Sequence, residues 1–281
     1  MVKGNTAQPA RDIFRAAVMT AALAVVSIYT PLLGLLGTLV WAVPVAFLTA
    51  TSGLRNGVIA VIAAGLMLGF FVAPGWAAGA ALQFGALGLV LGYFFEKGTA
   101  PGQVIVAGVL ASVLVTGVVF LMPLLFGSGQ GGIMANTEQI MEVWQETGLL
   151  ERFEQQGISR EQVEQSVRRA ADIFTRLLPS LVVVMAAGSA FVNFLVTRRF
   201  LARRSNISVP GLPPFTEWRM PWFAAWGLII GLGSALLGDY VNIQPLLTVG
   251  QNIICLYLPV VLVIGLSVGV NYYSGISSLL L

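Results

Sequence analysis

The residues best suited to carry chemistry in this chain are an amide and three aromatic rings in apolar surroundings. Trp76 directly follows Pro74-Gly75 and lies two helical turns before Gln83, so both side chains fall on roughly one helix face. A ring above an amide can hold a small planar or apolar molecule, which predicts a ligand site there. Tyr29 and Trp41, in the early apolar segments, are included in this predicted site. An interfacial aromatic belt and helix–helix hydrogen bonding are the alternatives.

The groups that usually carry catalysis are missing from the sequence. Histidine is absent, which excludes Ser-His-Asp triads, HExxH zinc sites and haem ligation by histidine. The single cysteine, Cys255, excludes disulfides within the chain and Cys-rich metal sites. No G-x-x-x-x-G-K-[ST] phosphate loop occurs. We therefore predict that the protein is not an enzyme and has no catalytic residues, no metal and no cofactor.

Composition places these residues in a lipid bilayer. Of the 281 residues, 57% are hydrophobic and 10% are charged, whereas soluble domains average about a quarter charged. One spanning helix needs about 20 apolar residues, which predicts an all-α fold: a polytopic α-helical membrane protein with about eight transmembrane helices. The predicted spans are 14 to 30, 33 to 51, 57 to 73, 76 to 95, 103 to 126, 177 to 197, 221 to 238 and 246 to 272.

One long polar segment, 127–176, separates the fifth span from the sixth. Two capping boxes predict a pair of helices in it, and a glycine interrupts the first. These signals are Asn136 with Gln139, Ser159 with Gln162, and Gly148. The second helix is predicted to continue directly into the sixth span. We interpret the segment as an outer amphipathic helical hairpin, which either lies on the membrane surface or serves as a lid or partner-binding site.

These features divide the chain into four predicted regions. They are a five-span membrane part over 1–126, the extracytoplasmic hairpin over 127–176, a long sixth span with a basic cytoplasmic end over 177–204, and a Pro-rich cytoplasmic loop with the C-terminal spans over 205–281. The last apolar run, 276–281, is too short to cross a bilayer. We expect a truncated product whose full-length form continues into a ninth span.

Charge asymmetry predicts the orientation. With the N-terminus inside, the inner side receives ten basic and three acidic residues, a net charge of +7. The outer side receives five basic and nine acidic residues, a net charge of −4. By the positive-inside rule the N-terminus is cytoplasmic and the hairpin is extracytoplasmic. The basic balance follows from this topology, so we predict no nucleic-acid partner.

Polar residues inside the predicted spans are uncharged. No Asp, Glu, Lys or Arg falls in the middle of a span, which is unlike a proton-coupled antiporter, an ion pump or a voltage sensor. Asn193, Gln251 and Asn252 join Gln83 as embedded amides. Each amide can read a substrate by hydrogen bonds or join two helices.

Several motifs carry a family resemblance over almost the whole chain. They are YTPLLGLLGTLVWAVPVAFL, the TSGLRNG turn, LGLVLGYFFEKG and PPFTEWRMPW, after an Ala-rich first span. Together they resemble the YybS-like family of predicted bacterial membrane proteins. The N-terminal part is also similar to the substrate-binding (S) components of energy-coupling-factor transporters, which are six-helix membrane proteins that capture vitamins or metal ions on the outer side.

The similarity to S components implies a partner contact. In those proteins an A-x-x-x-A face on the first helix touches the transmembrane coupling protein, and the matching residues here are Ala17 and Ala21. Internal packing of the same alanines is the alternative. The hairpin and the last two spans exceed the six-helix pattern.

Two functions from different classes follow. The first is a membrane-embedded binding subunit of a transporter for a small uncharged or amphiphilic solute, whose partners are the lipid bilayer, a coupling protein and ATPases. The second is a non-transport scaffold for an envelope-associated complex. An intramembrane enzyme is disfavoured because paired carboxylates and histidine are missing. We expect a multi-pass protein of a bacterial plasma membrane.

Overall fold

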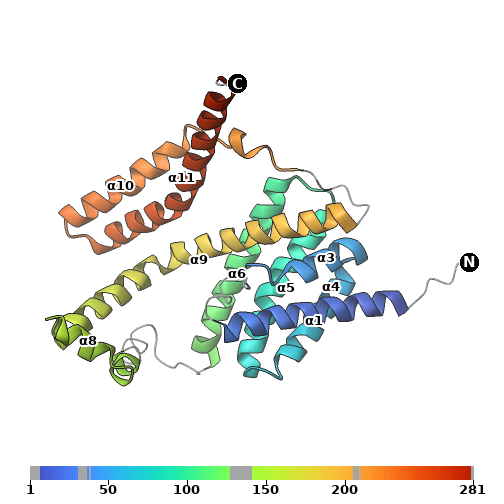
Figure 1. Cartoon of the computed structure of the whole chain (residues 1–281), viewed down its shortest axis with the longest axis horizontal. Coiled ribbons are helices and arrows are strands. Elements are labelled where there is room, and N and C mark those ends of the chain that lie inside the picture. Colours follow the sequence, from blue (N-terminus) through green and yellow to red (C-terminus); the bar gives the residue numbers. More distant parts are fainter. Residues whose placement is uncertain are drawn as a thin grey trace, which may run out of the picture. The chain divides into compact units, whose positions relative to one another are not determined.

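The chain folds as an all-α protein, as predicted. In a computed structural model, the described residues (7–30, 37, 39–126, 141–204, 209 and 211–279) form helices joined by turns and loops, and no strand occurs among them. In chain order the elements are α1 (Ala7–Tyr29), α3 (Val43–Ser52), α4 (Leu54–Leu68), α5 (Pro74–Glu96), α6 (Pro101–Phe126), α8 (Leu149–Gln155), α9 (Arg160–Arg204), the 3₁₀ turn η1 (Phe215–Glu217), α10 (Ala224–Tyr240) and α11 (Gln244–Leu279) (Figure 1).

The predicted set of eight spans is recovered in part. Among the described residues, α5, α6, α9 and α11 are long and apolar enough to cross a membrane, while α3, α4 and α10 are apolar but shorter. The predicted span 33 to 51 differs most from the observed structure. A turn over 39–42 precedes α3, whose ten residues reach only about 15 Å, half of the hydrocarbon core. Residues 31–36 and 38 lie outside the described residues.

Packing divides the chain into two units. Unit 1 comprises Met1–Phe120 with Val183–Pro213, and unit 2 comprises Leu121–Val182 with Pro214–Leu281. The boundaries predicted after 126, 176 and 204 follow the polar segments, whereas packing divides the chain inside α6 and α9.

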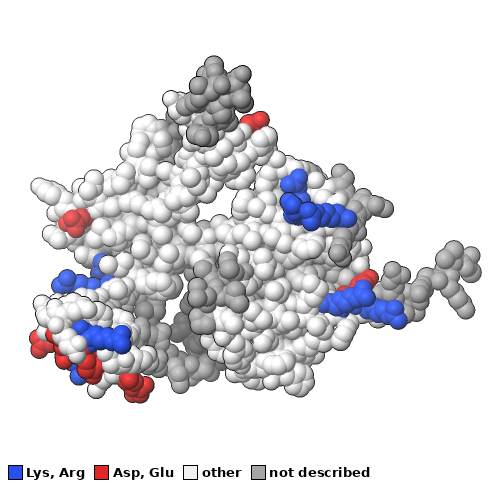
Figure 2. Space-filling model, viewed as in Figure 1, with Lys and Arg blue, Asp and Glu red and all other residues white. Residues whose placement is uncertain are grey.

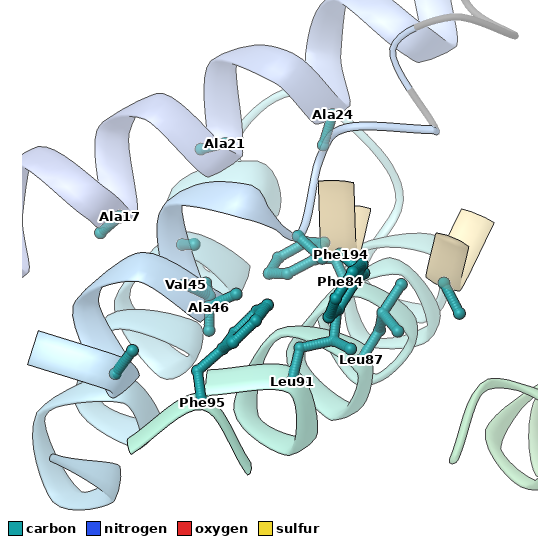
Figure 3. Packing of buried hydrophobic residues seen from close by; sticks show 14 of the residues in the cluster. Ala17, Ala21, Ala24, Val45, Ala46, Phe84, Leu87, Leu91, Phe95 and Phe194 are labelled. Carbon is teal, nitrogen blue, oxygen red and sulfur yellow. The ribbon is translucent and has the colours of Figure 1, made fainter. Parts of the chain in front are cut away.

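Small residues bring the helices of unit 1 together. α3 is buried on most sides and packs against α5, where a Cβ on Gly92 would lie 2.6 Å from the carbonyl oxygen of Ala46. Ala17 and Ala21 of α1 face the same apolar core (Figure 3). The short α3 is therefore shielded by neighbouring helices, which compensates for its length.

α10 and α11 form a tight antiparallel pair in unit 2 (Figure 1). A Cβ on Gly238 would lie 2.3 Å from the backbone nitrogen of Leu247, and one on Gly250 would lie 2.3 Å from that of Ala235. Asn242, in the turn between the helices, has a φ of 58°, a left-handed conformation that asparagine tolerates. Backbone-to-backbone packing at glycine is typical of helix pairs in membranes.

An amide joins α11 to α9 within unit 2. The Asn252 Oδ1 accepts a hydrogen bond from the Ser180 backbone nitrogen at 3.0 Å, and its Nδ2 donates to the Arg176 carbonyl at 2.8 Å. The side chain thus bonds two backbone groups one helical turn apart, next to Pro179, which has no N–H of its own. Asn252 therefore joins two helices, which was one of the two roles considered for the embedded amides.

The second predicted capping box starts α9. The Gln162 backbone nitrogen donates to the Ser159 Oγ at 3.3 Å, and the Ser159 backbone nitrogen donates to the Gln162 Oε1 at 3.0 Å. α9 then continues for 45 residues, about 68 Å, so the prediction that this helix runs into the sixth span is confirmed.

The described part of the predicted hairpin contains short helices ahead of α9. Gly148, with a φ of 69°, separates a helical turn over 141–146 from α8, as predicted. The Trp144 and Phe153 rings lie 6.0 Å apart and hold the two short helices against each other. Asn136 and Gln139, the other predicted capping box, lie outside the described residues.

Candidate functional site

Asn193 of α9 forms hydrogen bonds to two different segments of unit 1. Its side chain is fully buried, and its Nδ2 donates to the Leu39 carbonyl at 2.8 Å and to the Ser189 carbonyl at 2.8 Å. Leu39 belongs to the turn before α3, so this amide joins two segments that are 154 residues apart in the chain. The Asn193 Oδ1 is buried and has no hydrogen-bond partner in the described structure.

Thr197 follows Asn193 by one helical turn and lies on the same helix face. It is fully buried, and its Oγ1 also has no partner in the described structure. Buried polar atoms are nearly always hydrogen-bonded, and an unpaired one costs about 1 to 3 kcal/mol. The two oxygens therefore present unused hydrogen-bonding capacity within an apolar bundle.

Aromatic rings surround this part of unit 1. Trp41, two residues after Leu39, is half-buried, and its ring meets Phe84 edge-on at 5.8 Å. Phe194, beside Asn193, stacks on Phe95 at 5.3 Å. Figure 3 shows Phe84, Phe95 and Phe194 turned toward the same region of the core. The arrangement places two unpartnered oxygens in a core that also contains flat aromatic rings.

The four predicted ligand residues differ in exposure and in hydrogen-bond partners. Trp41 lies in the core just described, whereas Trp76 at the start of α5 is 77% exposed. The Gln83 Oε1 accepts a hydrogen bond from Thr116 of α6 at 3.2 Å, which favours the helix-joining alternative for this amide. Tyr29 is largely exposed, and its hydroxyl donates to the Phe71 carbonyl at 2.7 Å. That Trp76 and Gln83 hold one solute together stays a prediction.

Ala17 and Ala21, the predicted partner contacts, are buried inside unit 1 at 0% and 5% exposure. α1 packs against α3 and α4. The structure therefore favours internal packing for these alanines, because a face that is already covered by its own chain cannot also receive a partner helix.

The sequence predicts that Asn193 is an embedded amide, but it does not predict the contact with the turn at Leu39. The signal available was an asparagine in an otherwise apolar span, followed four residues later by Thr197. The turn at Leu39 lies inside a continuous apolar run, and that run was interpreted as one span. The partner of Asn193 therefore had no sequence signal.

The fold and these buried polar groups define an α-helical membrane protein with uncharged polar residues in its interior. Residues 18–276 match the family described as "Predicted membrane protein (DUF2232)". This match covers most of the chain, so the chain belongs to that family. No curated protein and no solved structure matches it.

Proposed function

We propose that this protein is a membrane-embedded binding subunit of a transporter and that unit 1 holds a small uncharged or amphiphilic solute. The observation that carries the proposal is the pair of buried, unpartnered oxygens, Asn193 Oδ1 and Thr197 Oγ1, one turn apart on α9. A solute that donates hydrogen bonds would satisfy both oxygens. The neighbouring rings of Trp41 and Phe84 would cover its apolar part.

The charge distribution supports an uncharged solute. The described helices that can cross a membrane place their charged residues toward the ends, as at Glu96 of α5 and Arg198 to Arg204 of α9. A charged solute in this interior would need a counter-charge, because isolated ions in apolar surroundings are strongly disfavoured. A coupling protein and ATPases as partners are proposed from the resemblance of the N-terminal sequence to S components alone, and their contact would lie away from the buried Ala17 and Ala21.

Thr197→Val tests the proposal because it removes an unpartnered hydroxyl without changing the size of the side chain. We expect the solute-free protein to be unchanged or up to about 1 kcal/mol more stable, since a buried unpaired group is lost. Retention of small molecules should weaken about fivefold, because one hydrogen bond to the solute is lost. Native mass spectrometry of protein purified in mild detergent measures retention, and thermal unfolding measures stability.

Thr116→Val is the matched control, since that hydroxyl is already bonded to Gln83 and to the Ser112 carbonyl. It should lower stability and leave solute retention unchanged. Loss of stability in Thr197→Val with no retained molecule in the parent protein would contradict the proposal. Co-purification with envelope-assembly proteins, without a retained solute, would favour the scaffold alternative.

We propose that the N-terminus is cytoplasmic and that α8 is extracytoplasmic, because of the +7 and −4 charge asymmetry. In a Cys255→Ala background, a cysteine at the exposed Gln156 should react with an impermeant maleimide in intact cells. A cysteine at the exposed Arg203 should react only after lysis. The reverse labelling pattern would overturn the orientation.

A further inference from the structure

The inner face of α9 and its outer face differ near the end of the helix. Ala190, Phe194, Thr197 and Leu201 are buried and follow one another at helical spacing. A neighbouring face carries Leu195, Arg198, Arg199 and Ala202, which line a surface depression of about 400 Å³. The lining is mostly apolar, and two of its four residues are arginines.

The two arginines lack an anionic partner. Among the described residues, the ion pairs are Arg15 with Asp12 and Arg168 with Glu164, so neither Arg198 nor Arg199 is neutralised there. The Arg198 Nε is buried and has no hydrogen-bond partner in the described structure. Figure 2 shows basic side chains grouped where α9 ends. An unpaired, partly desolvated guanidinium favours an anion with oxygens in a planar or tetrahedral array.

The position of Arg198 along α9 indicates the level of the depression relative to the bilayer. The apolar stretch of α9 ends at Thr197, and Arg198 and Arg199 are the first charged residues after it. Leu195 lies inside this stretch, about one turn before Arg198, and is 37% exposed. In a spanning helix this order places the arginines at the level of lipid phosphates and Leu195 at the level of acyl chains.

We propose that the surface formed by Leu195, Arg198, Arg199 and Ala202 binds an anionic phospholipid of the bilayer. The guanidinium groups contact the phosphate, and an acyl chain lies against Leu195 and Ala202. The Arg198 guanidinium lies close to Gly211, where a Cβ would be 3.0 Å from the Arg198 Nη2. Asn193 and Thr197 are buried and do not line this depression, so the two sites are distinct.

The test is a lipid titration of the delipidated full-length chain, followed by native mass spectrometry. Phosphatidylglycerol should bind at least about tenfold more tightly than phosphatidylcholine. Arg198→Gln with Arg199→Gln should lower the phosphatidylglycerol affinity about 30-fold, because two basic charges near the bilayer surface are removed. Arg168→Gln with Arg169→Gln removes the same charge from the same helix and should change the affinity less than about twofold.

Two further measurements make the outcome decisive. Ala202→Phe fills the depression without changing charge and should also lower phosphatidylglycerol affinity, which covers the case in which the double arginine variant fails to fold. Inorganic phosphate at millimolar concentration should not displace the lipid, since the acyl contact is then missing. Equal affinity for the two lipids, equal losses in both arginine pairs, or displacement by phosphate alone would overturn the proposal.

Discussion

Replacing Gly250 by alanine is expected to lower the free energy of unfolding by about 3 kcal/mol, the effect of forcing extra volume into a closely packed contact. The new Cβ would lie 2.3 Å from the backbone nitrogen and 2.7 Å from the Cα of Ala235. No rotamer change relieves an overlap with backbone, so α11 must move away from α10. SDS titration of the purified protein in mixed micelles, followed by circular dichroism, measures the loss.

Gly265→Ala is the matched control on the same helix. Nothing lies within 4 Å of a Cβ at Gly265, so the substitution meets open space. Alanine favours helix over glycine by about 1 kcal/mol, and Gly265→Ala should therefore be neutral or stabilising. The same chemical change thus has opposite signs at two positions of α11. Equal effects at both positions would contradict the close packing of α10 and α11.

Gly92→Ala is expected to have a comparable effect in unit 1. Its Cβ would lie 2.4 Å from the Cβ of Thr49 and 2.6 Å from the carbonyl oxygen of Ala46, both on α3. Because α3 is buried on most sides, it has little space to move away. A loss of about 3 kcal/mol corresponds to a fall in melting temperature of about 10 °C for a chain of this size. Circular dichroism during heating of the purified protein in detergent measures the melting temperature.

Gly75→Ala provides the comparison within α5, since nothing lies within 4 Å of a Cβ there. Its melting temperature should stay within about 3 °C of the parent protein. If the Gly92→Ala and Gly75→Ala variants have the same melting temperature, the close approach of α3 to α5 does not exist in the folded protein. A fall confined to Gly92→Ala supports the packing in Figure 3.

The sequence alone predicted those features of the fold that are decided by residues close together in the chain. The apolar composition predicted an all-α membrane protein, because backbone groups in lipid must bond within their own helix. The capping box at Ser159 and Gln162 and the break at Gly148 were predicted correctly. Each of these features is decided by residues within about one helical turn.

Contacts between distant segments were decided by tertiary structure alone. The run 33–51 has enough apolar residues for a span, yet its described part contains a turn and the short α3, which only neighbouring helices can shield. Gln83 bonds to Thr116, and Asn193 bonds to the Leu39 carbonyl. The sequence around each amide is similarly apolar and does not indicate which partner it has. Ala17 and Ala21 have the spacing of a partner contact, but α1 turns them inward. An apolar or small side chain suits lipid, a partner and the core equally well, so only the packing of helices far apart in sequence selects among them.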